Sequence, residues 1–246
     1  MTSSGASAGG SAGTITAGEE DFNDLGNVDS TPQLFTGTIT PPASGSRYVI
    51  ELDNFVNGNT GAITSYLFAA YPYGSNGVAL VEITPGVGNA LAAGAAFGQS
   101  STSFASAQGY GMNVTAQNGG GFFENDIAEF TSTSTGFSGG NIDINDLGSQ
   151  PSGGNSFSGT ITMDSSPATG RGVFTSSILN GAIYTVDTNN VLFIETDTSQ
   201  VGIGSLAVQN ASSASSMAAS NLAARHLMAV RAGAKALKAK KAAEKK

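Results

Sequence analysis

Short apolar runs separated by turn residues fill the first 210 positions of the chain. The runs are rich in Val, Ile, Thr, Phe and Tyr, and Gly, Asn, Asp and Ser stand between them. This alternation is typical of short strands joined by tight turns, so we expect an all-β fold. The predicted strands lie near residues 14–22, 34–40, 46–53, 64–71, 77–84, 90–98, 109–116, 121–131, 136–144, 156–162, 170–177, 181–187, 190–196 and 201–209.

Part of this pattern is present twice. The string Asp21-Phe22-Asn23-Asp24-Leu25-Gly26 returns as Asp143-Ile144-Asn145-Asp146-Leu147-Gly148 at an offset of 122 residues. The string Phe35-Thr36-Gly37-Thr38-Ile39-Thr40 returns as Phe157-Ser158-Gly159-Thr160-Ile161-Thr162 at the same offset. A match at a fixed offset indicates two copies of one structural unit.

The repeat divides the chain into a series of segments. We expect a flexible leader (1–13), a first β unit (14–99), a joint (100–108), a second β unit (109–210) and an Ala/Lys-rich helical tail (211–246). The second unit opens with two strands for which the first has only small polar residues. Either the first unit is incomplete, or the given start is not the natural one. We expect each unit to be an antiparallel meander that closes toward a barrel, with a sandwich as the competing arrangement.

Charge is distributed very unevenly along the chain. Up to residue 210, two cations stand against 17 acidic residues, a net charge of −15, whereas residues 211–246 carry +7. A body this acidic is not expected to bind a specific nucleic acid. The chain has no cysteine, no apolar run long enough for a spanning helix and no visible signal peptide.

The basic tail is predicted to form a helix over residues 222–246. It has three interpretations: a solvated extension, a segment that docks on an acidic body of its own or a neighbouring chain, or a binder of an anionic polymer or surface. Docking on a neighbouring copy of the chain would make the protein a homo-oligomer. The basic residues concerned are Arg225, Arg231, Lys235, Lys238, Lys240 and Lys241.

Arg47 and Arg171 are the only cations of the β region, and they occupy equivalent positions in the two copies. Glu82 and Glu195 are equivalent to each other as well. The favoured interpretation is a structural Arg–Glu pair in each unit, because a buried charge without a partner costs several kcal/mol. The alternative is that the arginine binds a small anionic ligand inside a barrel, since Arg suits carboxylate recognition.

The repeated Asp/Asn string partly matches the opening of a calcium loop. The candidate ligands are Asp21, Asn23, Asp24, Asp143, Asn145 and Asp146. A calcium loop also needs an Asp or Asn at its fifth position and a bidentate Glu at its twelfth. Leu25 and Leu147 stand at the fifth position, and Pro32 and Gly154 at the twelfth. We therefore expect a turn, no metal and no cofactor.

Catalytic chemistry finds little support in the sequence. The chain has one histidine and no cysteine, which argues against nucleophilic triads. A hydrolase that uses paired carboxylates, with Glu124, Asp126 and Glu129 among the acids, remains a third alternative. We expect a protein that is not an enzyme.

The second copy carries a longer string of motifs, which the first copy follows in part: Asp-x-Asn-Asp-x-Gly, Phe-x-Gly-Thr, Gly-Arg-Gly, Tyr-x-Val-Asp, Leu-Phe-Ile-Glu-x-Asp and a closing Gln. This string resembles a repeat of large secreted or surface proteins of soil bacteria. The resemblance implies lipocalin-like meander barrels of uncharacterised function. The first copy departs from it in having Ser46-Arg47-Tyr48 for Gly-Arg-Gly. We expect an extracellular or cell-surface module with a structural, adhesive or binding role, with a cytoplasmic location as the alternative.

Overall fold

The fold is given by a computed structural model of the full chain. It describes residues 2–4, 12–24, 27–28, 31–56, 63–85, 92–118, 120–146, 154–166 and 168–209. The predicted helical tail, with Arg225, Arg231, Lys235, Lys238, Lys240 and Lys241, lies outside the described residues. Within them the chain is all-β and antiparallel.

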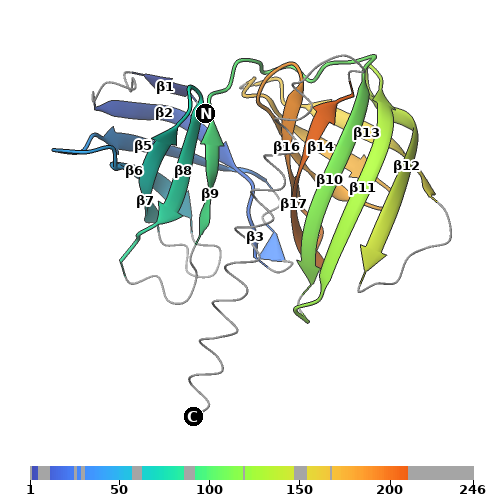
Figure 1. Ribbon diagram of the computed structural model, residues 1–246, viewed down its shortest axis with the longest axis horizontal. Helices are drawn as coiled ribbons and strands as arrows, with labels where there is room; N and C mark the ends of the chain where they lie inside the picture. Colours follow the sequence, from blue (N-terminus) through green and yellow to red (C-terminus); the bar gives the residue numbers. More distant parts are fainter. Residues whose placement is uncertain are drawn as a thin grey trace, which may run out of the picture.

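The second unit is a closed barrel of eight strands, shown on the right of Figure 1. Its strands follow in chain order, and β17 pairs with β10 to close the ring. They are β10 (Gly109–Asn118), β11 (Phe123–Ser132), β12 (Gly136–Asp146), β13 (Asn155–Met163), β14 (Arg171–Ser176), β15 (Asn180–Thr185), β16 (Asn190–Glu195) and β17 (Gln200–Val208). This confirms the predicted meander barrel over the sandwich.

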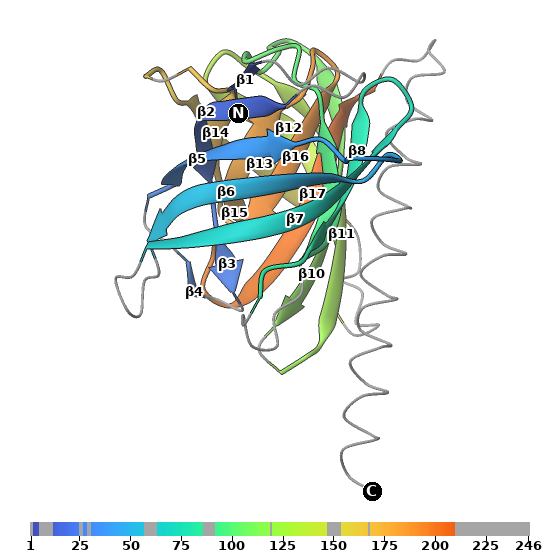
Figure 2. The same cartoon turned by 90° about the vertical axis from the view of Figure 1, so that its left-hand side faces the viewer.

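The first unit is an open sheet with the order β1-β2-β5-β6-β7-β8-β9. Its strands are β1 (Thr2–Ser4), β2 (Gly13–Glu20), β5 (Gln33–Thr40), β6 (Tyr48–Val56), β7 (Ile63–Tyr73), β8 (Gly77–Glu82) and β9 (Ala93–Phe97). A small hairpin of β3 (Asn23–Asp24) and β4 (Asn27–Val28) stands apart. In Figure 2, β2, β5, β6 and β7 lie across the strands of the barrel.

Every predicted strand corresponds to a strand of the structure, with ends that differ by at most three residues. Three short strands were not predicted: β1, which lies in the predicted leader, and the β3–β4 hairpin. The repeat is structural as well, because both copies shift register at equivalent places. The shifts lie between Ile15 and Gly18 in β2 and between Phe137 and Gly140 in β12.

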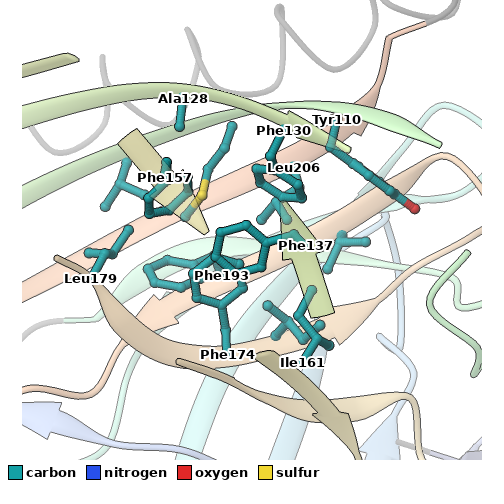
Figure 3. Close-up of a cluster of buried hydrophobic side chains, with 14 of the residues drawn as sticks. Tyr110, Ala128, Phe130, Phe137, Phe157, Ile161, Phe174, Leu179, Phe193 and Leu206 are labelled. Atoms are coloured by element: carbon teal, nitrogen blue, oxygen red, sulfur yellow. The ribbon is translucent and has the colours of Figure 1, made fainter. Parts of the chain in front are cut away.

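Alternate side chains of the barrel strands point inward and fill the interior. The buried apolar side chains of this core include Tyr110, Met112, Val114, Phe130, Phe137, Ile142, Phe157, Phe174, Leu179, Ile183, Val191, Phe193 and Leu206. The aromatic rings among them contact one another across the barrel, as Figure 3 shows. Phe137 stacks on Phe174 with ring centroids 4.5 Å apart, and Phe193 meets Phe174 edge-on at 5.7 Å.

Candidate functional site

Arg171 lies on the outer wall of the barrel, at the start of β14. Phe174 of the same strand belongs to the core, so the alternation of a strand turns Gly172 inward and Arg171 outward. Tyr184 of β15 stands directly opposite Arg171 in the register, and it points outward because Ile183 beside it is in the core. The two side chains therefore share one outer face, and Arg171 does not line the interior.

Asp21 of the first unit occupies this face of the second. Its carboxylate accepts two parallel hydrogen bonds from the Arg171 guanidinium, from Nε to Oδ2 and from Nη2 to Oδ1, each 2.6 Å long. Tyr184 donates its hydroxyl to Oδ2 at 2.5 Å and accepts the Asp21 backbone N–H at 3.0 Å. Asp164 Oδ2 accepts a hydrogen bond of 2.8 Å from the third guanidinium nitrogen, Nη1. We call Asp21, Asp164, Arg171 and Tyr184 the clamp.

The clamp is a largely buried, charge-assisted arrangement. The side chains of Arg171 and Asp21 are 8% and 6% exposed. The hydrogen bond to Asp21 raises the pKa of Arg171, and burial raises the pKa of Tyr184, with the Asp21 charge acting in the same direction. Arg171 therefore stays charged and Tyr184 stays neutral at any physiological pH. The bidentate geometry that suits an anionic ligand is already filled by a carboxylate of the same chain.

Asn23 makes a second attachment between the units. Its side-chain Nδ2 donates to the carbonyls of Glu195 and Gln200 at 2.8 Å and to that of Asp197 at 3.3 Å. These carbonyls belong to the turn between β16 and β17. A further hydrogen bond between the units runs from the Thr169 hydroxyl of the second unit to the Glu19 carboxylate of the first. The end of β2 and the start of β3 thus bind the barrel over a short stretch.

The equivalent string in the second unit is part of a strand instead. Asp143 and Asn145 continue β12 and pair with Ile127 and Asn125 of β11. Among the described residues, the open sheet has the three residues of β1 in the place of β11. Without that neighbour, residues 21–24 leave the sheet after Glu20 and attach to the barrel. The two strings differ only in Phe22 against Ile144, so we attribute their different structures to the neighbouring strand.

Gln99 anchors the other end of the first unit, after β9. Its side-chain Nε2 donates to the carbonyls of Thr169 at 2.8 Å and Thr185 at 2.7 Å. Gly170, between these contacts, has a φ of +86°, and a Cβ there would lie 2.5 Å from the Gln99 nitrogen. Glycine is therefore required before Arg171 for two reasons, conformation and space. The equivalent position in the first copy is Ser46.

The predicted pair between Arg171 and Glu195 does not form. Glu195 is fully buried and points into the barrel with Val191 and Phe193, whereas Arg171 points outward. The two also stand at different heights, because Arg171 pairs with Tyr184 and Glu195 pairs with Gly181. The alternation of side chains along the strands and the register between the strands together keep Arg171 and Glu195 apart. The prediction was wrong in the partner of Arg171.

Glu195 belongs instead to an acid cluster, which we define as Glu124, Asp126 and Glu195; Glu124 is partly buried and the other two are buried. Gln200 bridges two of them, donating to Glu195 Oε1 at 2.8 Å and to Glu124 Oε1 at 3.1 Å. Burial raises the pKa of Glu195 to about 8, with the Asp197 carboxyl contributing. Burial also raises the pKa of Asp126 to about 7, assisted by Glu124. Within the described residues, Asp126 Oδ1 and Glu195 Oε2 have no hydrogen-bond partner.

The predicted pair in the first unit is absent as well. Arg47 is exposed ahead of β6 and forms no ion pair with any residue in the described part of the chain. Glu82 is buried at 7% exposure and accepts the backbone N–H of Ala92 at 3.1 Å. The equivalence of the two copies holds for the position of these residues and fails for their contacts, because the partner of Arg171 comes from another unit.

The predicted metal ligands are used in other ways. Asp21 is in the clamp, and Asn23 binds carbonyls through its nitrogen. Asp143 and Asn145 lie in β12, and so does Asp146. The side chain of Asp24 lies outside the described residues. Within the described ranges no group of three or more acidic or histidine side chains has the geometry of a metal site.

Sequence reasoning identified Arg171 and missed its partners. Asp21 lies 150 positions earlier, in the other unit, so no local spacing reveals the contact. One signal was present: the residues printed ahead of Asp21 do not repeat the strand pattern that stands ahead of Asp143. Asp164 and Gln99 carried no comparable signal.

Comparisons with known proteins add no name. Searches against models of protein families, against curated proteins and against solved structures find no significant match. In the described residues, no helix is long and apolar enough to cross a membrane.

Proposed function

We propose that this chain is a non-enzymatic, secreted or cell-surface β-repeat module with a structural or adhesive role. The observation that carries the proposal is the packed interior of the barrel. Aromatic side chains meet across its centre, from Phe130 and Phe137 to Phe193 (Figure 3). A small barrel filled in this way has a core rather than a ligand chamber. The resemblance to repeats of surface proteins supports the location.

The clamp also supports a structural role. It joins the open sheet of the first unit to the barrel of the second. It also pairs the arginine with carboxylates of the chain itself. Charged groups that bind a substrate need a free, reachable face. Here the charged groups hold neighbouring units together, which is what a module in a series of repeats requires.

The acid cluster gives little support to the alternative of a carboxylate-dependent hydrolase. Raised pKa values are common in catalytic carboxyl groups. However, Glu195 is fully buried and Asp126 is 3% exposed, beneath strands of a closed barrel. These two carboxyl groups therefore offer almost no surface to a substrate. We interpret Asp126 and Glu195 as buried acids that hold protons, with a consequence for stability rather than for turnover.

Two experiments test the proposal. Intact cells of the source are probed with antibodies to the barrel, and the cells are then fractionated. We expect labelling of intact cells or protein in the medium, and protein found only in the cytosol would overturn the surface location. Separately, the full chain is incubated with a mixture of fatty acids and dicarboxylates, repurified and weighed by native mass spectrometry. We expect the mass of the protein alone, and a retained ligand would favour the ligand-binding alternative.

A further inference from the structure

The first unit has an arginine and a tyrosine in the places that Arg171 and Tyr184 hold in the clamp. They are Arg47, just ahead of β6, and Tyr71 of β7. In the barrel, Arg171 pairs directly with Tyr184. In the open sheet, the pairing of β6 with β7 ends at Tyr48, so the next position along the same antiparallel register places Arg47 opposite Tyr71.

Both of these side chains belong to the outer face of the open sheet. Ile50 and Leu52 of β6 and Tyr66 of β7 pack on its inner core. Arg47 and Tyr71 stand an odd number of residues away from them, so the alternation of a strand turns both outward. Tyr71 is 43% exposed, and Arg47 is exposed as well. A partner can therefore reach the pair from solvent.

Arg47 has no acidic partner in the part of the chain that the structure describes. Arg171, in contrast, binds Asp21 and Asp164. The first copy has no carboxylate in the place of Asp164, because the offset of 122 puts Pro42 there. The same arginine–tyrosine pair thus holds a carboxylate in the second unit and leaves its guanidinium available in the first.

We propose that Arg47 and Tyr71 form a binding site for an extended acidic segment of another polypeptide, of the kind that residues 19–24 present to the barrel. An aspartate of this segment accepts two parallel hydrogen bonds from the Arg47 guanidinium and a third from the Tyr71 hydroxyl. The clamp shows this arrangement with Asp21. Arginine is well suited to hold a carboxylate in this bidentate way.

The segment comes from another polypeptide because both copies of the string in this chain are engaged. Asp21 is bound in the clamp. Asp143 belongs to β12, where its backbone pairs with Ile127 of β11. Moving either segment to the new site would break one set of contacts for each set that forms. The donor is therefore a segment that is not already held in this way.

The charge of the surroundings makes such a site selective. The β region has a net charge of −15, so it repels acidic peptides in general. An acidic segment is held only where a cation compensates for this repulsion. Of the two arginines of the β region, Arg171 is already paired with carboxylates, and Arg47 is the one that can supply the compensation.

The test uses a synthetic peptide of residues 19–26 and the full chain labelled with ¹⁵N. The peptide is added in steps, and the arginine Nε–H and backbone amide signals are followed by NMR, which detects weak binding. We expect saturable shifts of the Arg47 Nε–H and of the amides of residues 46–48 and 70–72. A peptide with Asp21→Asn keeps its shape and should bind at least about tenfold more weakly. Absence of a saturable shift at Arg47 would overturn the proposal.

Variants of the full chain test the two residues one at a time. Arg47→Gln removes the charge at an exposed position, and we expect affinity to fall at least about tenfold. Tyr71→Phe keeps the ring and removes the hydroxyl, with an expected loss of about threefold. Tyr73→Phe is the matched control, because Tyr73 is two residues further along the same face and 37% exposed. It should bind as the native chain does. Equal affinity of the Arg47→Gln and native chains would contradict the proposed site.

The NMR signals also show whether the peptide binds elsewhere. Shifts confined to residues 211–246 would assign the peptide to the basic tail and overturn the proposal. Shifts at Arg171 without shifts at Arg47 would mean that the peptide displaces Asp21, and would also overturn it. Displacement is disfavoured, because Asp21 is held in the same chain at a high effective concentration. Failure here leaves the packed barrel and the surface location untouched, so the inference and the proposed function are tested separately.

Discussion

Asp21 and Asp143 are the same residue at equivalent positions, and of the two only Asp21 meets an arginine in the part of the chain that the structure describes. Its carboxylate is buried with Arg171 and Tyr184, whereas Asp143 is exposed on β12. A carboxylate in such a place is stable only while its partner is present, because an unpaired buried charge is strongly destabilising. Stability is therefore expected to fall most when one member of the clamp is removed and its partner stays charged and buried.

Replacing Arg171 by alanine is expected to lower the free energy of unfolding by about 3–5 kcal/mol, because Asp21 would stay buried without a countercharge. Urea denaturation followed by circular dichroism measures the change. Arg47→Ala is the matched control at the equivalent, exposed position, and its effect should remain within about 0.5 kcal/mol. Equal effects of the two substitutions would contradict the role given to the clamp.

Glu195 makes stability depend on pH. Its pKa is about 8 in the folded chain against an ordinary value of 4.5, and that of Asp126 is about 7 against 3.8. Between these values the acid is protonated only when folded, so unfolding releases a proton. Stability therefore falls as pH rises from about 5 and reaches its lower level once pH exceeds 8. Melting temperatures measured from pH 5 to pH 9 should decrease.

The variant Glu195→Gln separates this effect from others. It keeps the shape of the side chain and removes one titrating group, so we expect a smaller decrease of the melting temperature with pH. At pH 9 the variant should melt above the native chain. Glu129→Gln, at an exposed position of β11, is the control and should keep the native slope. An unchanged slope in the Glu195 variant would show that its proton is not linked to folding.

At the scale of elements, β3 shows how a few polar contacts replace a missing strand. Asn23 donates to three carbonyls of the β16–β17 turn and fixes the segment after β2 against the barrel. Substitution by alanine leaves those carbonyls without this donor, at a cost of about 1–3 kcal/mol.

We expect Asn23→Ala to increase the exchange rate of amides in residues 21–24 and 195–200, measured by hydrogen exchange with mass spectrometry. Asn145→Ala is the matched substitution in the other copy. Its segment is held by the pairing of β12 with β11, so its exchange should change little. Equal responses at the two sites would mean that β3 is held by something other than Asn23.

Most of the strands could be predicted, because each is a run of apolar and β-branched residues between turn residues, and that pattern is local. The partner of Arg171 could not. Val191-Leu192-Phe193-Ile194 is apolar on both faces, so the sequence hides which face of β16 Glu195 belongs to. Arg171 points outward and Glu195 points inward because of the side-chain alternation and the register of their strands. Both are set by the turns and by closure of the barrel. The β3–β4 hairpin is too short to have a pattern of its own.

On the scale of the whole molecule, charge is the feature with the widest reach. The β region carries −15 and residues 211–246 carry +7. We expect the full chain to be retained on heparin resin at low salt and to elute as salt rises, because the attraction is screened. A chain ending at residue 210 should pass through unretained. Equal retention of both chains would assign the binding to the β region.

The dependence of one six-residue string on its neighbour has a mechanical consequence. The copy of the string that lies beside β11 stays inside β12. The other copy attaches the first unit to the barrel through Asp21 and Asn23. A pulling force that separates the two units therefore has to break the contact of Asp21 with Arg171 before residues 100–108 can extend.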